Sequence, residues 1–456
     1  MGKIDSIREG MEMKKSLFMV LLIISLIFIS GCAQKESKEE MNEISPAQEQ
    51  KMNATIVKED AQAPSKPFQE ENTTSEEASA EKKQPEEKVE LTFEKAVWNK
   101  RIDAAMAPSY CPPVTKVTYP SSYYQGPLID SHYHLPSLPD SLPGEEEGEA
   151  EMYKQYYGRD YVYEDDEEEE EDDEEGVEEP YLGKDIKMSE IACTLQHEGT
   201  TRNFALFPIY SEISPHALEM AKRAKEQYPE LFTPFMDRPT PEDYPAVKSE
   251  VLSEILAVYP GLFQGWGEIH LGISDDSTDF PPDSQFFTKI YPIIRKHQMM
   301  VWMHPREGMK DNFERVLKQN PDINFIVHGD QIKDDIEYLM SKHPNIYFCI
   351  NNFYANQNIF FSYEDGTAQT KESFFAALEN YESLIQKDLR TWKNLIEAHP
   401  DQVMWGLDRD EEVLWTFDRD VGLKLVDYAR AFIGRLDPTV QEKFAYKNAE
   451  RLITGQ

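Results

Sequence analysis

From residue 127 to residue 134 the chain reads Pro-Leu-Ile-Asp-Ser-His-Tyr-His, an apolar run that ends in two histidines. Seven more apolar runs follow it, and most of them also end in polar or charged residues. They cover residues 203–209, 231–236, 262–271, 299–304, 324–328, 345–350 and 402–408. Strands that alternate with helix-like stretches are typical of βαβ units and a parallel sheet. Eight such strands predict a (β/α)₈ barrel, the TIM barrel.

Two stretches between the strands, 215–227 and 286–296, are predicted as helices. The strand over 231–236 is the weakest of the eight, because Pro234 lacks a backbone donor and predicts a distortion. A doubly wound open sheet is the alternative fold. The barrel is preferred because no glycine-rich phosphate loop follows the first strand.

Ionisable side chains stand at the ends of these strands. His132 and His134 are two residues apart, so a regular strand places both imidazoles on one face. In a barrel the C-terminal strand ends converge on one mouth, where the catalytic groups of this fold lie. Six ligand-type side chains are therefore expected to meet there: His132, His134, Glu268, His304, His328 and Asp408.

A set of imidazole and carboxylate ligands without a thiolate suits Zn²⁺ or another borderline divalent ion. Such an ion makes a hydroxide nucleophile available at neutral pH, and a nearby carboxylate can serve as general base. One or two ions are compatible with the pattern. His270 shares the face of Glu268, and three roles stay open for it: an extra ligand, a substrate contact or a polar core residue.

Several of these motifs resemble those of the amidohydrolase superfamily of metal-dependent barrel hydrolases, with most similarity to the amidohydrolase-2 and TatD-type groups. The resemblance is carried by residues 130–134, by Gly267-Glu268-Ile269, by the fifth and sixth strands that end in histidine, and by Gly406-Leu407-Asp408. Residues 444–452 are similar to the terminal helix of the amidohydrolase-2 group, with its Asn-Ala-x-Arg-Leu run. The resemblance covers about residues 126–456.

The resemblance implies a role for each member of the cluster. His132, His134 and Asp408 would bind one metal ion, and Glu268 would stand where binuclear members have a bridging carboxylate or a carboxylated lysine. His304 and His328 would bind a second ion. With a single ion, His304 would join the first site and His328 would contact the substrate or the bound water. Asp408 would be the general base in both versions.

Substrate contacts are predicted from residues near the same mouth, namely His270, Arg306 and Arg409. A guanidinium group there could clamp a carboxylate or a phosphate. For each arginine the alternative is a loop residue that pairs with neighbouring acids. The chain departs from the amidohydrolase-2 pattern at residues 409–412, where charged residues follow Asp408.

The charge of the chain is concentrated outside the predicted barrel. The formal net charge is −38, from 47 Lys and Arg against 85 Asp and Glu. Residues 33–90 carry −7 and residues 145–179 carry −18, so the barrel itself is only moderately acidic. The acidic balance speaks against a nucleic-acid partner, because phosphate contacts need clustered Lys and Arg.

The first 32 residues are predicted to be a lipoprotein signal peptide. Lys14 and Lys15 precede an apolar run over 16–29, which is short for a membrane span. The sequence Ile29-Ser30-Gly31-Cys32 resembles the lipobox of prokaryotic lipoproteins and predicts lipidation of Cys32. Localisation is then extracytoplasmic, with the protein anchored to the membrane of a prokaryotic cell envelope. A plain signal anchor is the alternative.

Two segments are predicted to be disordered. Residues 33–91 are a linker poor in aromatic residues, which cannot bury enough apolar surface to fold. The barrel domain spans 92–456 and contains an acidic insertion at about 140–181, whose like charges repel one another. Its predicted roles are cation collection, repulsion of anionic substrates or solubility. Whether Cys111, Cys193 or Cys349 form a disulfide is left open, as is the oligomeric state.

The function predicted from the sequence is a membrane-tethered, metal-dependent hydrolase that acts on a C–N or C–O bond of a small molecule. Three alternatives remain: a decarboxylase of the same superfamily, a TatD-type phosphodiesterase or nuclease, and a surface binding lipoprotein without turnover. The acidic charge disfavours the nuclease, because a polyanionic substrate would be repelled.

Overall fold

The computed structural model describes residues 93–115, 117–139, 180–209, 215–237, 249–271, 280–357, 370–409 and 414–455. They all belong to one compact unit, Glu86–Gln456. The predicted signal peptide with Cys32, the linker over 33–91 and nearly all of the insertion at 140–181 lie outside the described residues. Among the helices that the structure describes, none has the length and apolar character to cross a bilayer.

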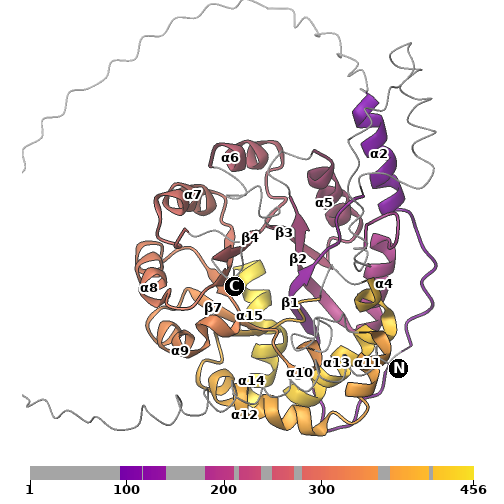
Figure 1. The fold of residues 1–456 in the computed structure, drawn as a ribbon, viewed down its shortest axis with the longest axis vertical. Coiled ribbons are helices and arrows are strands. Elements are labelled where there is room, and N and C mark those ends of the chain that lie inside the picture. Colours follow the sequence, from indigo (N-terminus) through magenta and orange to yellow (C-terminus); the bar gives the residue numbers. More distant parts are fainter. Residues whose placement is uncertain are drawn as a thin grey trace, which may run out of the picture. The chain divides into compact units, whose positions relative to one another are not determined.

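Eight parallel strands form one sheet in the order of the sequence, with helices around the outside (Figure 1). The chain is a (β/α)₈ barrel. The strands are β1 (Leu128–His134), β2 (Thr200–Pro208), β3 (Phe232–Asp237), β4 (Gly265–Leu271), β5 (Met300–Pro305), β6 (Phe325–Val327), β7 (Ile346–Ile350) and β8 (Val403–Trp405).

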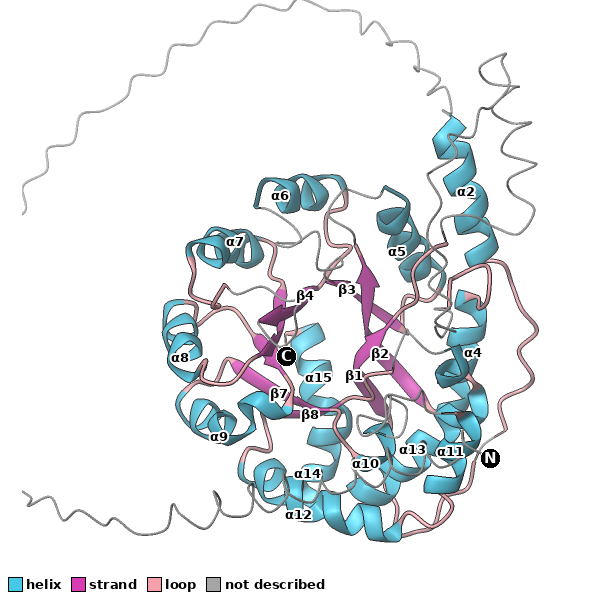
Figure 2. Cartoon of the chain, in the orientation of Figure 1, coloured by secondary structure: helices cyan, strands magenta, loops and turns pink. Residues whose placement is uncertain are grey.

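A helical connection follows each strand, as Figure 2 shows by colour. Among the described residues, the helices that follow the first five strands are α4 (Met188–Glu198), α5 (Pro215–Gln227), α6 (Ser249–Val258), α7 (Gln285–Lys296) and α8 (Lys310–Gln319). After β6 come η2 (Asp330–Ile332) and α9 (Lys333–Lys342), and after β7 come α10 (Tyr354–Gln357), α11 (Lys371–Ala377) and α12 (Glu382–Ala398). The chain begins its described part with α2 (Phe93–Ala105) and ends with η3 (Leu414–Phe417), α13 (Arg419–Ile433), α14 (Pro438–Glu442), the π-helical turn η4 (Lys443–Lys447) and α15 (Asn448–Thr454).

The helices fold because they bury one apolar stripe against the strands. In α7 the buried residues Phe287, Ile290, Tyr291 and Ile294 recur at the spacing that lines up one face of a helix. The predicted helix over 215–227 coincides with α5, and the one predicted over 286–296 begins one residue earlier, at Gln285.

Alternation along the strands separates the barrel interior from the layer under the helices. In β5, Val301 and Met303 pack in the outer core, whereas Met300 and Trp302 pack in the inner one. His304 continues the inner series. Near-continuous burial on both faces explains why these strands are recognisable as apolar runs in the sequence.

Two strands break this alternation, and both breaks matter for the site. In β1 the register shifts between Asp130 and Tyr133, so Leu128 faces outward although His132 and His134 face inward. The first strand is therefore irregular, although His132 and His134 still share the inward face. In β4 the register shifts between Trp266 and Ile269, which both face outward, and the extra residue turns Glu268 inward.

Gly267 makes the irregularity in β4 possible. Its φ of 108° lies in a region that residues with a side chain rarely adopt. A Cβ atom at this position would lie 2.1 Å from the carbonyl oxygen of Trp302 in the neighbouring strand. Glycine is therefore required on both conformational and steric grounds.

The barrel closes between β8 and β1 through individual contacts. The backbone N–H of Asp408 donates to the carbonyl oxygen of His132 at 2.9 Å, and Tyr133 pairs with Arg409 as an isolated bridge. The hydroxyl of Ser131 donates to the carbonyl oxygen of Trp405 at 2.7 Å. Strand β8 ends at Trp405, so Asp408 stands three residues beyond it rather than at its last position as predicted.

The C-terminal helix covers the N-terminal end of the barrel, and Figure 1 shows α15 within the ring of strands. Ala449, Leu452 and Ile453 pack against the inner apolar cluster. The side-chain amide of Asn448 donates to the carbonyl oxygens of Pro400 and Val403 at the start of β8, both at 2.8 Å. This is the part of the chain that resembles the terminal helix of the amidohydrolase-2 group.

Candidate metal centre

Seven ligand-type side chains meet inside the barrel at the C-terminal strand ends. They are His132 and His134 from β1, Glu268 and His270 from β4, His304 from β5, His328 after β6 and Asp408 after β8. The six predicted ligands are thus neighbours in space, and His270 lies beside them.

Two imidazole nitrogens approach two carboxylate oxygens at the spacing of metal ligands. The Nε2 atom of His132 lies 3.0 Å from Nε2 of His134 and 2.9 Å from Oε2 of Glu268. Oδ1 of Asp408 lies 3.2 Å from Nε2 of His132 and 3.4 Å from Nε2 of His134. An ion at about 2.0–2.1 Å from each of four tetrahedral ligands separates the ligand atoms by about 3.3 Å. The donor set and its spacing therefore fit a divalent ion.

The second oxygen of Glu268 faces a different set of imidazoles. Its Oε1 atom lies 3.2 Å from Nδ1 of His304 and 3.3 Å from Nε2 of His270, and it also contacts Nε2 of His328. Glu268 is buried, and its two oxygens point to the two halves of the histidine cluster. This is the geometry that a bridging carboxylate needs.

The electrostatics of the cluster keep its carboxylates ionised. Burial alone would raise the pKa of Glu268, but the imidazoles of His328, His132 and His270 outweigh it and hold that pKa well below its usual value. The same balance, with His132 and His134 as the main partners, lowers the pKa of Asp408. Both carboxylates are therefore charged at neutral pH.

The histidines differ among themselves. Burial lowers the pKa of His328 to about 4 despite the opposing effect of Glu268, so its imidazole is neutral near pH 7 and can act as a ligand. For His132, burial favours the neutral ring, but Asp408 and Glu268 prevail and raise the pKa.

Residues that hold the ligands in place complete the centre. Oδ2 of Asp237 lies 3.2 Å from Nδ1 of His134, which leaves Nε2 of that ring for a metal. The other carboxylate oxygen of Asp237 accepts a 3.0 Å hydrogen bond from the backbone N–H of Glu268. His304 lies with Nε2 3.3 Å from Oε1 of Gln331, so its Nδ1 atom is the one presented to Glu268.

Asn351 contacts three members of the site at once. Its Nδ2 atom lies 3.1 Å from Nδ1 of His132 and 3.0 Å from Nδ1 of His328, and it donates a 2.5 Å hydrogen bond to Oδ2 of Asp408. The side chain is buried. It orients both rings and the carboxylate that follows β8.

Sequence reasoning did not find Asp237 or Asn351, although a signal for both was present. The predicted third strand stops at residue 236 and the seventh at residue 350, each one residue short of the polar side chain. Phe235 on β3 and Cys349 on β7 face the interior, so alternation places Asp237 and Asn351 inward as well.

The prediction for Arg409 needs a correction. Its side chain is fully buried, and NH2 of its guanidinium lies 2.7 Å from Oε1 of Glu198 at the end of α4. The guanidinium carbon Cζ of Arg409 lies over the ring of Tyr133, 5.3 Å from the ring centroid. Because Asp408 faces inward, the next residue faces outward between the barrel and α4, where it has no access to a substrate at the mouth.

Asp408 itself has strained backbone geometry, with a φ of 50°. The buried ion pair of Arg409 with Glu198 fixes the residue that follows it, and the backbone bond to His132 fixes its own nitrogen. Arg409 is thus a positioning residue. Arg306 follows β5 and is half-buried; its predicted substrate contact stays a prediction.

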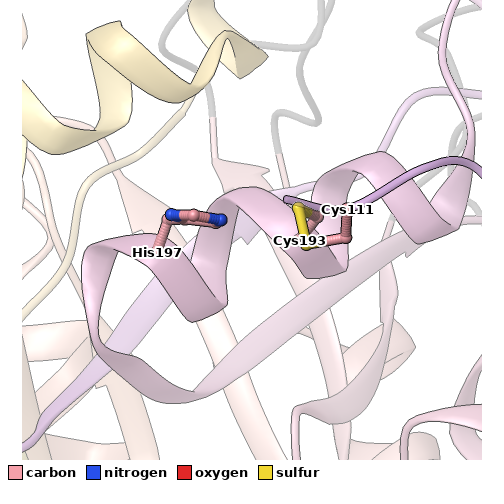
Figure 3. A group of neighbouring side chains, drawn as sticks. All are labelled: Cys111, Cys193 and His197. Carbon is pink, nitrogen blue, oxygen red and sulfur yellow. A yellow bond between two sulfur atoms is a disulfide. The ribbon is translucent and has the colours of Figure 1, made fainter. Parts of the chain in front are cut away.

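A disulfide joins Cys111 in the segment after α2 to Cys193 in α4 (Figure 3). This answers the question that the sequence left open, and Cys349 is a buried free thiol. His197, on the same helix, lies near the two sulfurs, but its Nε2 is 3.1 Å from the carbonyl oxygen of Pro112. Because the sulfurs are bonded to each other, this group is a covalent tie rather than a second metal centre.

No family model matches the chain, and no curated protein matches it. Among solved structures, an amidohydrolase from Burkholderia multivorans with bound HEPES is 12% identical, with a TM-score of 0.41, and the match covers 72% of this chain and 99% of that one. A probable 2-pyrone-4,6-dicarboxylic acid hydrolase from Acinetobacter baumannii is 14% identical, with a TM-score of 0.39. The match covers 71% of this chain and 98% of that one.

A 2,6-dihydroxybenzoate decarboxylase is also similar, at 12% identity and a TM-score of 0.39, with 72% of this chain and 99% of that one covered.

Proposed function

We propose that the chain is a metal-dependent hydrolase of the amidohydrolase type that cleaves a C–N or C–O bond in a small molecule. The observation that carries this proposal is that Nε2 of His132 and Nε2 of His134 each lie 2.9–3.4 Å from a carboxylate oxygen of Glu268 and from one of Asp408. These side chains come from β1, β4 and the segment after β8, so the fold brings two carboxylates from distant parts of the sequence next to two imidazoles.

A divalent ion held by these residues would lower the pKa of a water molecule and polarise a carbonyl group. The residues of the chain would do the rest. Asp408 is ionised, and its Oδ2 atom is held by Asn351, so this carboxylate is placed to accept a proton and return it to the leaving group. His328, neutral near pH 7, would contact the substrate or complete the ligand set.

The direct test is metal analysis of the purified full-length chain together with its His132→Ala variant. We expect stoichiometric transition metal in the wild type and its loss in the variant, because His132 contacts both carboxylates. The matched control is His297→Ala, which removes a half-buried histidine at the end of α7. A wild-type chain that stays free of metal under metal-replete conditions overturns the proposal.

Turnover is tested on a panel of amides, lactones, phosphodiesters and aromatic carboxylic acids. Hydrolysis of an amide or lactone that disappears in His132→Ala supports the proposal. Cleavage of phosphodiesters or loss of carbon dioxide points instead to the nuclease or the decarboxylase, and a metal-loaded chain without turnover points to a binding protein.

We further propose that the protein is an extracytoplasmic lipoprotein anchored through Cys32. The signal-like sequence before Cys32 supports this, and so does the Cys111–Cys193 disulfide, because disulfides persist mainly in oxidising compartments. Cys32→Ser should release the protein from the membrane fraction and abolish incorporation of labelled fatty acid. Membrane association that survives in the variant would contradict the proposal.

A further inference from the structure

The position of His270 raises a question that the proposed hydrolase does not answer. Three features distinguish it from an ordinary polar residue at a strand end. It lies on the interior face, two residues after Glu268, because the irregularity at Gly267 turns both side chains inward. It pairs in register with His304 on β5, so the two imidazoles are direct neighbours, with ring centroids 5.3 Å apart. Its Nε2 atom points at a carboxylate oxygen.

The oxygen that His270 faces is Oε1 of Glu268, the one directed away from His132 and His134. Nε2 of His270 lies 3.3 Å from it, and Nδ1 of His304 lies 3.2 Å from it. Both distances match the spacing of ligand atoms around a tetrahedral ion, which is about 3.3 Å. The same spacing separates Oε2 of Glu268 from Nε2 of His134 in the first set of ligands.

We infer that His270 is a ligand of a second divalent ion, together with Oε1 of Glu268, His304 and His328. The inference rests on the proposed metal-dependent function and extends it. It adds a third imidazole to the two that the family resemblance implies for this position, and it replaces the predicted substrate contact of His270.

The two ion sites then differ in chemistry. The first has two imidazoles and oxygens from two carboxylates, Asp408 and Glu268. The second has three imidazoles and a single carboxylate oxygen. Imidazole-rich sites favour Zn²⁺, Co²⁺, Ni²⁺ or Cu²⁺, whereas Mg²⁺ and Mn²⁺ prefer oxygen ligands. The second site should therefore discriminate strongly against Mn²⁺, and the first less strongly.

The test compares the full-length wild type with His270→Ala and with the control His297→Ala. Each protein is stripped with a chelator, then dialysed against buffered Zn²⁺, and the bound metal is measured by mass spectrometry. We expect two zinc ions per wild-type and control chain. We expect His270→Ala to keep one ion at unchanged affinity and to bind the other at least about tenfold more weakly.

A second variant guards against a folding defect in the first. His270→Asp exchanges an imidazole for an oxygen ligand and should raise the affinity of the second site for Mn²⁺ relative to Zn²⁺ at least about tenfold. In the Co²⁺-loaded proteins, the visible absorption of one of the two ions should change in both variants and stay unchanged in His297→Ala.

The outcomes separate the two proposals. A wild-type chain without metal overturns the hydrolase and the inference together. A wild type with one ion, or a His270→Ala variant that binds two with wild-type affinities, overturns only the inference. In the latter case a higher KM at unchanged kcat would return His270 to the role of substrate contact.

Discussion

The two ends of the barrel interior differ sharply. Towards the N-terminal strand ends the interior is filled by apolar rings and chains, among them Phe204, Phe235 and Trp302, and α15 covers it. Towards the C-terminal ends it holds the seven side chains of the candidate metal centre, in overlapping groups of three whose ligand atoms lie within 4.8 Å of one another, with Asp237 beside His134. The same strands supply both ends. One end stabilises the barrel, and the other concentrates charge that is costly to bury unless a cation balances it.

The difference predicts that substitutions at the two ends separate stability from metal binding. Apolar substitutions at the covered end should lower the free energy of unfolding and leave the ligand set in place. Substitutions around the charged end should alter metal binding, and their effect on stability should depend on whether a buried charge is left without a partner.

Arg409→Met should have the largest effect on stability, about 3–5 kcal/mol lost, because it leaves the buried carboxylate of Glu198 unpaired. Metal affinity should fall as well, since Asp408 loses the anchor of its neighbour. Urea unfolding at neutral pH measures the first effect. The double variant Glu198→Met/Arg409→Met should regain most of the stability; an equal loss in both variants would assign the effect to packing.

Phe204→Ala tests the covered end. Phe204 lies on β2, a strand that supplies none of the proposed ligands. The centroid of its buried ring lies 5.0 Å from that of Phe235, on which it stacks, and 6.4 Å from that of Trp302. Its removal should lower the free energy of unfolding by about 3–4 kcal/mol. Zinc stoichiometry should stay at the wild-type value, and a loss of zinc would show that the two ends are not separable.

Gly267→Ala should affect both properties. A φ of 108° and a Cβ atom 2.1 Å from a carbonyl oxygen predict a loss of about 2–3 kcal/mol in unfolding free energy. The relief of this strain would turn Glu268 away, so metal content should fall too. Gly308→Ala is the control, because φ is 77° there and nothing lies within 4 Å; it should cost about 1 kcal/mol and keep the metal.

Asp388→Asn isolates a buried carboxyl that belongs to neither end. Burial in α12 raises its pKa to about 7, against the opposing hydrogen bond from the hydroxyl of Tyr428. The folded state therefore holds a proton that the unfolded state releases near pH 4. This stabilising contribution is complete below that pH and is lost as pH rises through 7.

From pH 5 to pH 8, the wild type should lose about 1–2 kcal/mol more unfolding free energy than Asp388→Asn, measured by urea unfolding of both chains. Parallel pH profiles of the two chains would show that the carboxyl is already ionised at pH 5.

Much of the fold could be predicted because buried parallel strands are apolar on both faces. All eight strands lie within two or three residues of their predicted bounds, and Pro234 is accommodated in an unbroken β2–β3 ladder. The strand-end rule also brought six ligand-type residues together correctly. It missed Asp237 and Asn351 because the predicted strands ended one residue too early.

By itself the sequence determined the barrel, the mouth and the residue types that meet there, because alternation and apolar runs are local properties. Only the tertiary structure decided which way individual side chains face. The irregularities in β1 and β4 turn His132 and Glu268 inward, and the outward turn after Asp408 pairs Arg409 with Glu198. These choices depend on neighbouring strands and on a helix more than 200 residues away, so no local pattern encodes them.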